Sequence, residues 1–112
     1  MTFEEAMEYA LRLPGTQRST SYGEPCVKAN GNGFLFVGHE AHEAFALHVD
    51  REVKPMLLDA HPETFFETPH YSGYPIVLVR YEGSDEDLVR EMIGRAANWA
   101  RAKRPPRRRK KS

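Results

Sequence analysis

The chain has 112 residues, of which 40% are apolar and 29% are charged, and this composition is typical of one soluble globular domain with its own core. A transmembrane helix is not expected, because no run of about 18 apolar residues occurs, and a signal peptide is not expected, because the first residues are acidic. The single cysteine, Cys26, cannot form an internal disulfide, which favours a cytoplasmic location. The formal net charge of zero hides a separation, since the first 100 residues contain all 16 acidic and only 8 of the 16 basic residues (net −8), whereas the last 12 carry +8.

The first predicted element is a helix that begins after Thr2. Thr2 and Glu5 have the spacing of a capping box, in which each side chain accepts a hydrogen bond from the other residue's backbone N–H. The apolar residues that follow recur with the helical period, and Pro14-Gly15 ends the helix.

The next part of the chain is predicted to form antiparallel strands. Residues 16–29 have the composition of extended chain, interrupted at Gly23-Glu24-Pro25. The sequence Asn30-Gly31-Asn32-Gly33 is typical of a tight hairpin turn, which would pair residues 26–29 with residues 34–37. A second turn over 38–43 leads to a strand over 44–49 with alternating faces.

A second helix is predicted from about Lys54, after a capping residue at Asp50, and it ends at His61-Pro62. A short strand over 64–67 and a loop over 68–75 follow. Residues 76–81 form the most apolar stretch, and both faces of this predicted strand are apolar apart from Arg80. We therefore expect a central strand with a neighbour on each side.

The last predicted helix begins at Ser84, with acidic residues in its first turn and an apolar stripe that reaches Trp99. After Ala102 the chain reads KRPPRRRKKS, which cannot pack and is expected to be disordered. The sequence thus predicts an α+β domain over residues 1–102 and a basic tail over 103–112. The domain is expected to have two layers, an antiparallel sheet of about five strands and three helices mainly on one face.

Five ordered blocks of this sequence resemble the MmcQ/YjbR family, a group of small bacterial proteins. The blocks are FEEAxxYALRLPG, TSYGxP, HVD, FFxTPHYSGYPIVLVRY and the last helix with its tryptophan, and they span residues 3 to about 100. The tail departs from the family's usual pattern, so its role is not inherited.

The resemblance implies a two-layer α/β domain related in shape to secretion-chaperone-like folds and to a double-wing DNA-binding domain. Family members are commonly labelled DNA-binding on that basis, which is an analogy between folds. The resemblance brings no catalytic residue, cofactor or metal with it.

The loop before the central strand is a candidate site. His70, Tyr71 and Tyr74 would offer hydrogen-bonding groups and ring faces that can stack on a base or form the walls of a small-molecule pocket. Residues expected on the same side of the sheet are Tyr22, Lys28 and Arg80. The alternative is structural, in which the loop forms a corner that leads into the central strand.

The tail is the strongest electrostatic signal. Its basic side chains can neutralise phosphates with an affinity that depends on salt and not on base sequence. The alternatives are a solvating tail, or one that folds back on the acidic body. The candidate phosphate-binding residues are Lys103, Arg104, Arg107, Arg108, Arg109, Lys110 and Lys111.

Metal and nucleophile chemistry are not expected. His39 and His42 lie in a predicted turn, and Cys26 has neither a CxxC partner nor a neighbouring base in sequence. Two hypotheses therefore stand: a non-enzymatic DNA-binding protein whose tail holds the phosphates, or a module that binds a protein partner or a small ligand. No cofactor and no membrane contact is expected from either.

Overall fold

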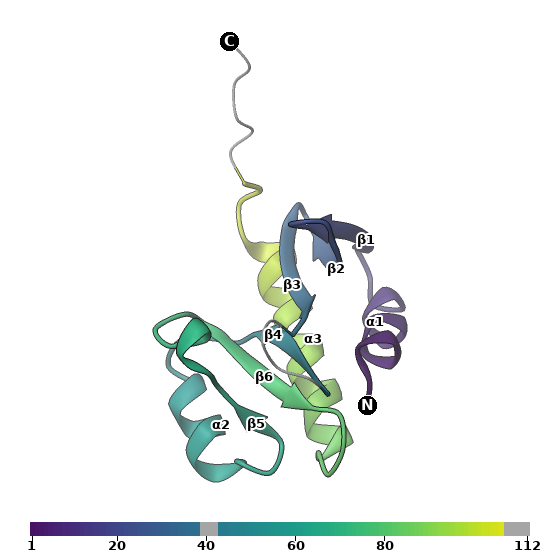
Figure 1. The fold of residues 1–112 in the computed structure, drawn as a ribbon. Coiled ribbons are helices and arrows are strands. Elements are labelled where there is room, and N and C mark those ends of the chain that lie inside the picture. The colour runs from purple at the N-terminus through teal and green to yellow at the C-terminus, as the bar shows by residue number, and fades with distance from the viewer. Residues whose placement is uncertain (39–42, 107–112) are drawn as a thin grey trace.

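The computed structural model describes residues 1–38 and 43–106, and within them the chain forms three α-helices and one six-stranded antiparallel sheet of order β1-β2-β3-β4-β6-β5 (Figure 1). The predicted α+β class is confirmed, with six strands instead of about five. The elements in chain order are α1 (Phe3–Leu11), β1 (Thr16–Ser21), β2 (Glu24–Ala29), β3 (Asn32–Val37), β4 (Ala44–His48), α2 (Lys54–Ala60), β5 (Phe65–Phe66), the 3₁₀ turn η1 (Pro69–Tyr71), β6 (Ile76–Arg80) and α3 (Glu86–Ala102).

The main core lies between one face of the sheet and the helices α1 and α3. Figure 1 shows α3 behind the sheet and α1 beside it, while α2 lies at the opposite side next to β5. Buried side chains of α1 and α3 pack against the largest core residues of the strands. Those strand residues include Phe34, Leu35, Phe45, Leu47, Val77 and Val79.

The strand β6 has neighbours on both sides, as the sequence predicts, because it pairs with β4 and with β5.

The observed caps of α2 and α3 differ from the expected ones. Asp85, not Ser84, caps α3, since its carboxylate accepts a hydrogen bond from the backbone N–H of Leu88 at 3.2 Å. The Ser84 hydroxyl instead donates to the carbonyl of Arg80 at 2.5 Å and closes the turn after β6. The N-cap of α2 is Val53, without a side-chain cap.

A bulge in β3 turns the side chain of Phe36 to the face that α1 and α3 leave uncovered. Val27 pairs with Leu35 but Lys28 pairs with Gly33, so Phe34 is the extra residue. Phe34 and Leu35 both enter the main core, and Phe36 packs on the other face. A Cβ atom at Gly33 would lie only 2.8 Å from two ring atoms of Phe36.

Replacing Gly33 by alanine should therefore lower the free energy of unfolding by about 1–3 kcal/mol, because the Phe36 ring must move to make room. The matched control is Gly94→Ala in α3, where an added Cβ meets nothing within 4 Å. That variant should gain about 0.5–1 kcal/mol from helix propensity. Urea unfolding of the two variants checks the prediction, and equal stability of both would contradict it.

Candidate functional site

The face of the sheet opposite α1 and α3 carries its own apolar row. Ala46 lies opposite Phe36 on one side and Leu78 on the other, and Leu78 lies opposite Phe66. Ala44, Ala46 and Leu78 are buried, whereas the aromatic members Phe36 and Phe66 are only partly covered. Within residues 1–38 and 43–106, no α-helix covers this apolar face in the way that α1 and α3 cover the other side.

A cavity of about 340 Å³ lies on this face between the β1–β2 turn and the 3₁₀ turn η1. The sheet provides an apolar base, and the two turns provide aromatic and polar side chains at its sides. We call this cavity the groove. Its lining residues are Ser21, Tyr22, Glu24, Pro25, Phe36, Val37, Ala46, His70, Tyr71 and Ile76.

Tyr22 occupies an unfavourable backbone conformation beside the groove. Ser21 pairs with Glu24, so Tyr22-Gly23 is a two-residue hairpin loop, and the φ angles of +53° and +82° identify a type I′ turn. Asn-Gly is the preferred sequence for this turn, whereas a bulky side chain at positive φ is strained. The Tyr22 side chain gains no compensating burial, because it is fully exposed.

On the opposite side of the groove, Lys54 fixes the backbone that carries Tyr71. The Lys54 ammonium donates to the carbonyl oxygens of Tyr71 (3.0 Å) and Tyr74 (2.8 Å) and forms an ion pair with Glu67 (2.7 Å). Lys54 itself is only 8% exposed. The Tyr71 ring packs on the apolar row and stands edge-on to the His70 ring, with centroids 4.8 Å apart.

The structure brings some of the predicted site residues together and separates others. Tyr22, His70 and Tyr71 line the groove. Tyr74 is 59% exposed and instead lines a separate cavity with residues of α2. Arg80 stacks over the Phe66 ring at 4.2 Å, at the far end of the same face.

Lys28 lies on the groove side of the sheet as well. Its Cγ atom is 3.9 Å from the position that a Cβ of Gly33 would take, next to the ring of Phe36. Neither Lys28 nor Arg80 lines the groove. The apolar base of the groove was not among the predicted site residues. The alternation of Ala44 and Ala46 with Phe45 and Leu47 was its one visible signal.

The start of the basic tail is held against the β2–β3 turn. The amide of Asn32 donates to the carbonyl oxygens of Ala100 (3.1 Å) and Lys103 (3.2 Å), and the amide of Asn30 donates to Lys103 at 2.8 Å. These bonds satisfy carbonyls that the end of α3 leaves without helical partners. Of the predicted phosphate-binding residues, Lys103 and Arg104 belong to this fixed segment; Arg107 to Lys111 lie outside the described residues, as do His39 and His42.

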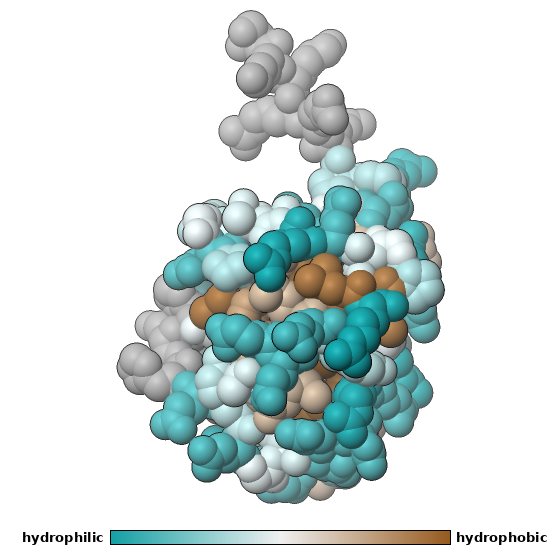
Figure 2. Space-filling model, turned by 90° about the vertical axis from the view of Figure 1, so that its right-hand side faces the viewer, coloured by the Kyte–Doolittle hydropathy of each residue, from teal (hydrophilic) through white to brown (hydrophobic). Residues whose placement is uncertain are grey.

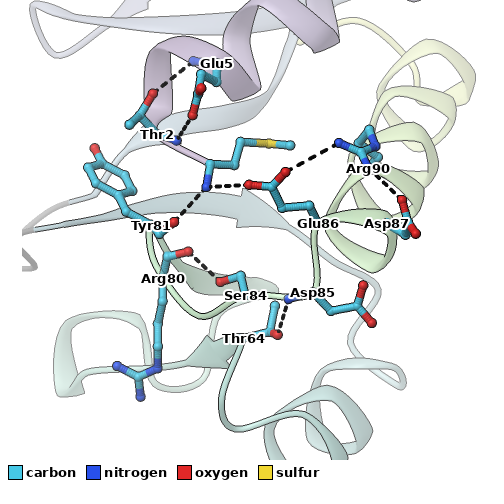
Figure 3. A network of polar contacts seen from close by, with 11 residues as sticks. Thr2, Glu5, Thr64, Arg80, Tyr81, Ser84, Asp85, Glu86, Asp87 and Arg90 are labelled. Atoms are coloured by element: carbon cyan, nitrogen blue, oxygen red, sulfur yellow. Dashed lines mark hydrogen bonds and ion pairs between the residues drawn. The ribbon is translucent and has the colours of Figure 1, made fainter.

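The opposite end of the molecule is acidic. The amino group of Met1 donates to the carbonyl of Tyr81 (2.6 Å) and forms an ion pair with Glu86 (3.1 Å), so α1 and α3 begin side by side (Figure 3). Arg90 bridges Glu86 and Asp87. The first turns of both helices carry acidic pairs, where the helix macrodipoles favour negative charge.

The side of the molecule that carries α1 is mainly hydrophilic. Figure 2 shows this side, where teal hydrophilic side chains surround a smaller brown area. The groove lies on another face, and none of its lining residues belongs to α1. The surface that carries the acidic first turn of α1 is therefore separate from the groove.

Besides Lys54, two further titratable side chains in the described part of the chain are buried and lie outside the groove lining. Burial raises the pKa of the Cys26 thiol, which favours the protonated and poorly nucleophilic form. Burial also lowers the pKa of His48 to about 4, and its ring stacks on Trp99 with centroids 3.5 Å apart. Within residues 1–38 and 43–106, no three His, Cys, Asp or Glu side chains are grouped to hold a metal ion.

A sequence model of a protein family described as YjbR matches residues 11–96, which is most of the chain. A search of curated proteins found no match. No helix in the described part of the chain is long and apolar enough to cross a membrane.

Proposed function

The chain belongs to the YjbR family, and from that premise we propose that it is a non-enzymatic DNA-binding protein whose basic C-terminal end contacts the phosphates. The proposal agrees with the DNA-binding label that the resemblance to this family implies. The observation that carries it is the separation of charge along α3, from an acidic start to a basic end.

The length of α3 weakens one electrostatic objection to DNA binding. The first 100 residues have a net charge of −8, which would repel a polyanion that approached all of them equally. Asp87 in the acidic first turn and Arg101 in the last turn of α3 are 14 residues apart, or about 21 Å along the helix. This is more than two Debye lengths of about 8 Å at physiological salt, so the acidic end is largely screened from phosphates at the basic end.

The attachment of the tail's first residues to the folded domain also supports the proposal. Asn30 and Asn32 hold the backbone of Lys103 beside the β2–β3 turn, and the Lys103 ammonium lies 4.9 Å from the centre of the Trp99 ring. Phosphate contacts made by Lys103 and Arg104 would therefore be attached to the folded domain and not to the tail alone.

The non-enzymatic part of the proposal is supported by the roles that the reactive side chains already have. The Cys26 thiol is buried with a raised pKa. Carboxylates of Glu5 and Asp85 accept backbone hydrogen bonds at helix starts, which explains them as caps.

A salt titration of DNA binding tests the proposal. The full chain should bind a short labelled duplex with a log–log salt slope of about −0.9 per phosphate contact. A variant with glutamine at all seven predicted phosphate-binding positions should bind at least about a hundredfold more weakly at about 50 mM salt, because the counterion release is lost. Fluorescence anisotropy measures both quantities.

The control is Arg95→Gln, which removes one exposed positive charge from the outer side of α3. Its affinity should stay within about twofold of the parent chain, since Arg95 already faces Glu91 at 3.6 Å. No binding by the full chain at low salt would refute the proposal. Equal salt slopes for the parent and the glutamine variant would refute the role of the tail.

A further inference from the structure

We propose that the groove binds a small organic cation, an ammonium group carried on an apolar body. This inference goes beyond DNA binding and rests on a different surface, because none of the tail residues that the structure describes, 103–106, lines the groove. A volume of about 340 Å³ is at the lower end of the range of small-molecule pockets.

The charge of the lining favours a cation. Among the described residues that line the groove, Glu24 carries the one full negative charge, and none is lysine or arginine. An anionic ligand would meet Glu24 without a compensating positive side chain in the lining.

The rings of the lining provide the second element of recognition. Tyr22, Phe36 and Tyr71 come from the β1–β2 turn, β3 and η1, so three elements contribute aromatic residues to the groove lining. Ammonium groups are attracted to the faces of such rings, and aromatic sites recognise quaternary or alkylated ammonium ligands in this way.

The hollow for the apolar body follows from a small side chain at the centre of the row. Ala46 lies between the larger Phe36 and Leu78 on neighbouring strands. Ala46 lines the groove together with Phe36 and Ile76, so the base of the groove is apolar. An apolar ligand body placed there would lose water-exposed surface.

The strained turn makes it possible to test whether Tyr22 has a binding role or a structural one. Asn30-Gly31 forms the other two-residue turn with positive φ angles, +53° and +79°, and it has the preferred sequence. Tyr22-Gly23 has nearly the same φ angles with a tyrosine that is fully exposed. Tyr22→Asn should therefore raise the melting temperature by about 2–6 °C while it removes a ring from the groove.

The binding test uses three probes with one apolar body and different charge: phenylbutylammonium, phenylbutanamide and phenylbutyrate. Titrations followed by amide NMR shifts should place the cation in the groove and show at least about tenfold weaker binding of the anion. Glu24→Gln should reduce the preference for the cation, and Tyr22→Asn should weaken its binding at least about threefold.

Tyr74→Asn is the matched control, because Tyr74 is also an exposed tyrosine but lies outside the groove. It should leave binding of the cation unchanged. The proposal is overturned if none of the probes shifts groove residues, if the anion binds as well as the cation, or if Tyr22→Asn gains stability without loss of binding. The glutamine variant of the tail should bind phenylbutylammonium as the parent does, so failure of the DNA proposal would not affect this result.

Discussion

Replacing Lys54 by methionine should lower the free energy of unfolding by about 2–4 kcal/mol, which is among the largest effects expected from one substitution in this chain. The Lys54 ammonium contacts two carbonyl oxygens and the Glu67 carboxylate within 3.0 Å. Methionine keeps most of the apolar stem but leaves these acceptors without their donor. Burial makes the loss severe, because little water can replace the ammonium at a residue that is 8% exposed.

Two further variants separate the ion pair from the carbonyl contacts. Adding Glu67→Gln to Lys54→Met should recover part of the loss, since the unpaired carboxylate is then gone. The matched control is Arg51→Met, because Arg51 donates to the carbonyl of Gly73 in the same loop but does so at the surface. Its loss should stay below about 1 kcal/mol.

Equilibrium unfolding in urea compares the parent chain, Lys54→Met, the double variant and Arg51→Met. Equal losses of unfolding free energy for Lys54→Met and Arg51→Met would show that burial of the ammonium does not matter. A second readout is the amide NMR spectrum of the folded fraction. Because Lys54 fixes the backbone at Tyr71 and Tyr74, the residues around η1 should shift most.

The elements that the sequence predicts well are those set by contacts between neighbouring residues. The capping box of Thr2 and Glu5 is present as expected, with both hydrogen bonds formed. The β2–β3 turn at Asn30-Gly31 has the positive φ angles that its composition demands. In both cases the deciding interactions span three residues or fewer, so the local sequence contains all the necessary information. The resemblance to the MmcQ/YjbR family, which rests on ordered blocks of sequence, is confirmed by the family match.

The features that local reasoning missed depend on partners far away in the sequence. The bulge at Phe34 exists because Phe34 and Leu35 are both buried against the helices, and no local pattern reveals which residue is extra. Lys54 was expected only as the start of a helix, yet its acceptors lie up to 20 residues further on. At the start of α3, Ser84 and Asp85 are both good caps, and the hydrogen bond from Ser84 to Arg80 decides between them.

The candidate loop also contains both kinds of residue, those whose position was expected from the sequence and one whose position depends on a distant partner. His70 and Tyr71 were expected beside Tyr22, and all three line the groove. Tyr74 belongs to the same short loop, but the carbonyl contacts of Lys54 hold the loop so that Tyr74 faces α2. The surroundings of Tyr74 are therefore set by the Lys54 ammonium, 20 residues away in the sequence, and not by the residues next to Tyr74.

The buried ring of His48 should make the stability of the domain depend on pH below neutrality. His48 is 6% exposed and stacks on Trp99, and its Nδ1 atom has no hydrogen-bond partner in the described part of the chain. A protonated ring would carry a second N–H donor and a charge into this setting. Burial is the main reason that its pKa falls to about 4; Lys103 and Arg51 lower it further, and Asp50 opposes the shift.

The sign of the pH effect follows from proton uptake by the unfolded chain. Its histidine titrates near pH 6.5, whereas folded His48 stays neutral until about pH 4, so the unfolded state binds the extra proton between these values. The stability contributed by neutral His48 is thus complete above pH 6.5 and is lost as the pH falls towards 4, by about 2 kcal/mol at pH 5.

His48→Phe keeps a flat ring against Trp99 but cannot bind a proton, which makes it the comparison protein for this prediction. Carboxylates titrate in both proteins, so the difference between their unfolding free energies isolates His48. Relative to the variant, the parent should lose about 2 kcal/mol between pH 7 and pH 5 in urea unfolding. Parallel losses in the two proteins would mean that His48 accepts a proton in the folded state as readily as in the unfolded chain. The ring stacked on Trp99 would then have to open to water at a much lower cost than its burial implies.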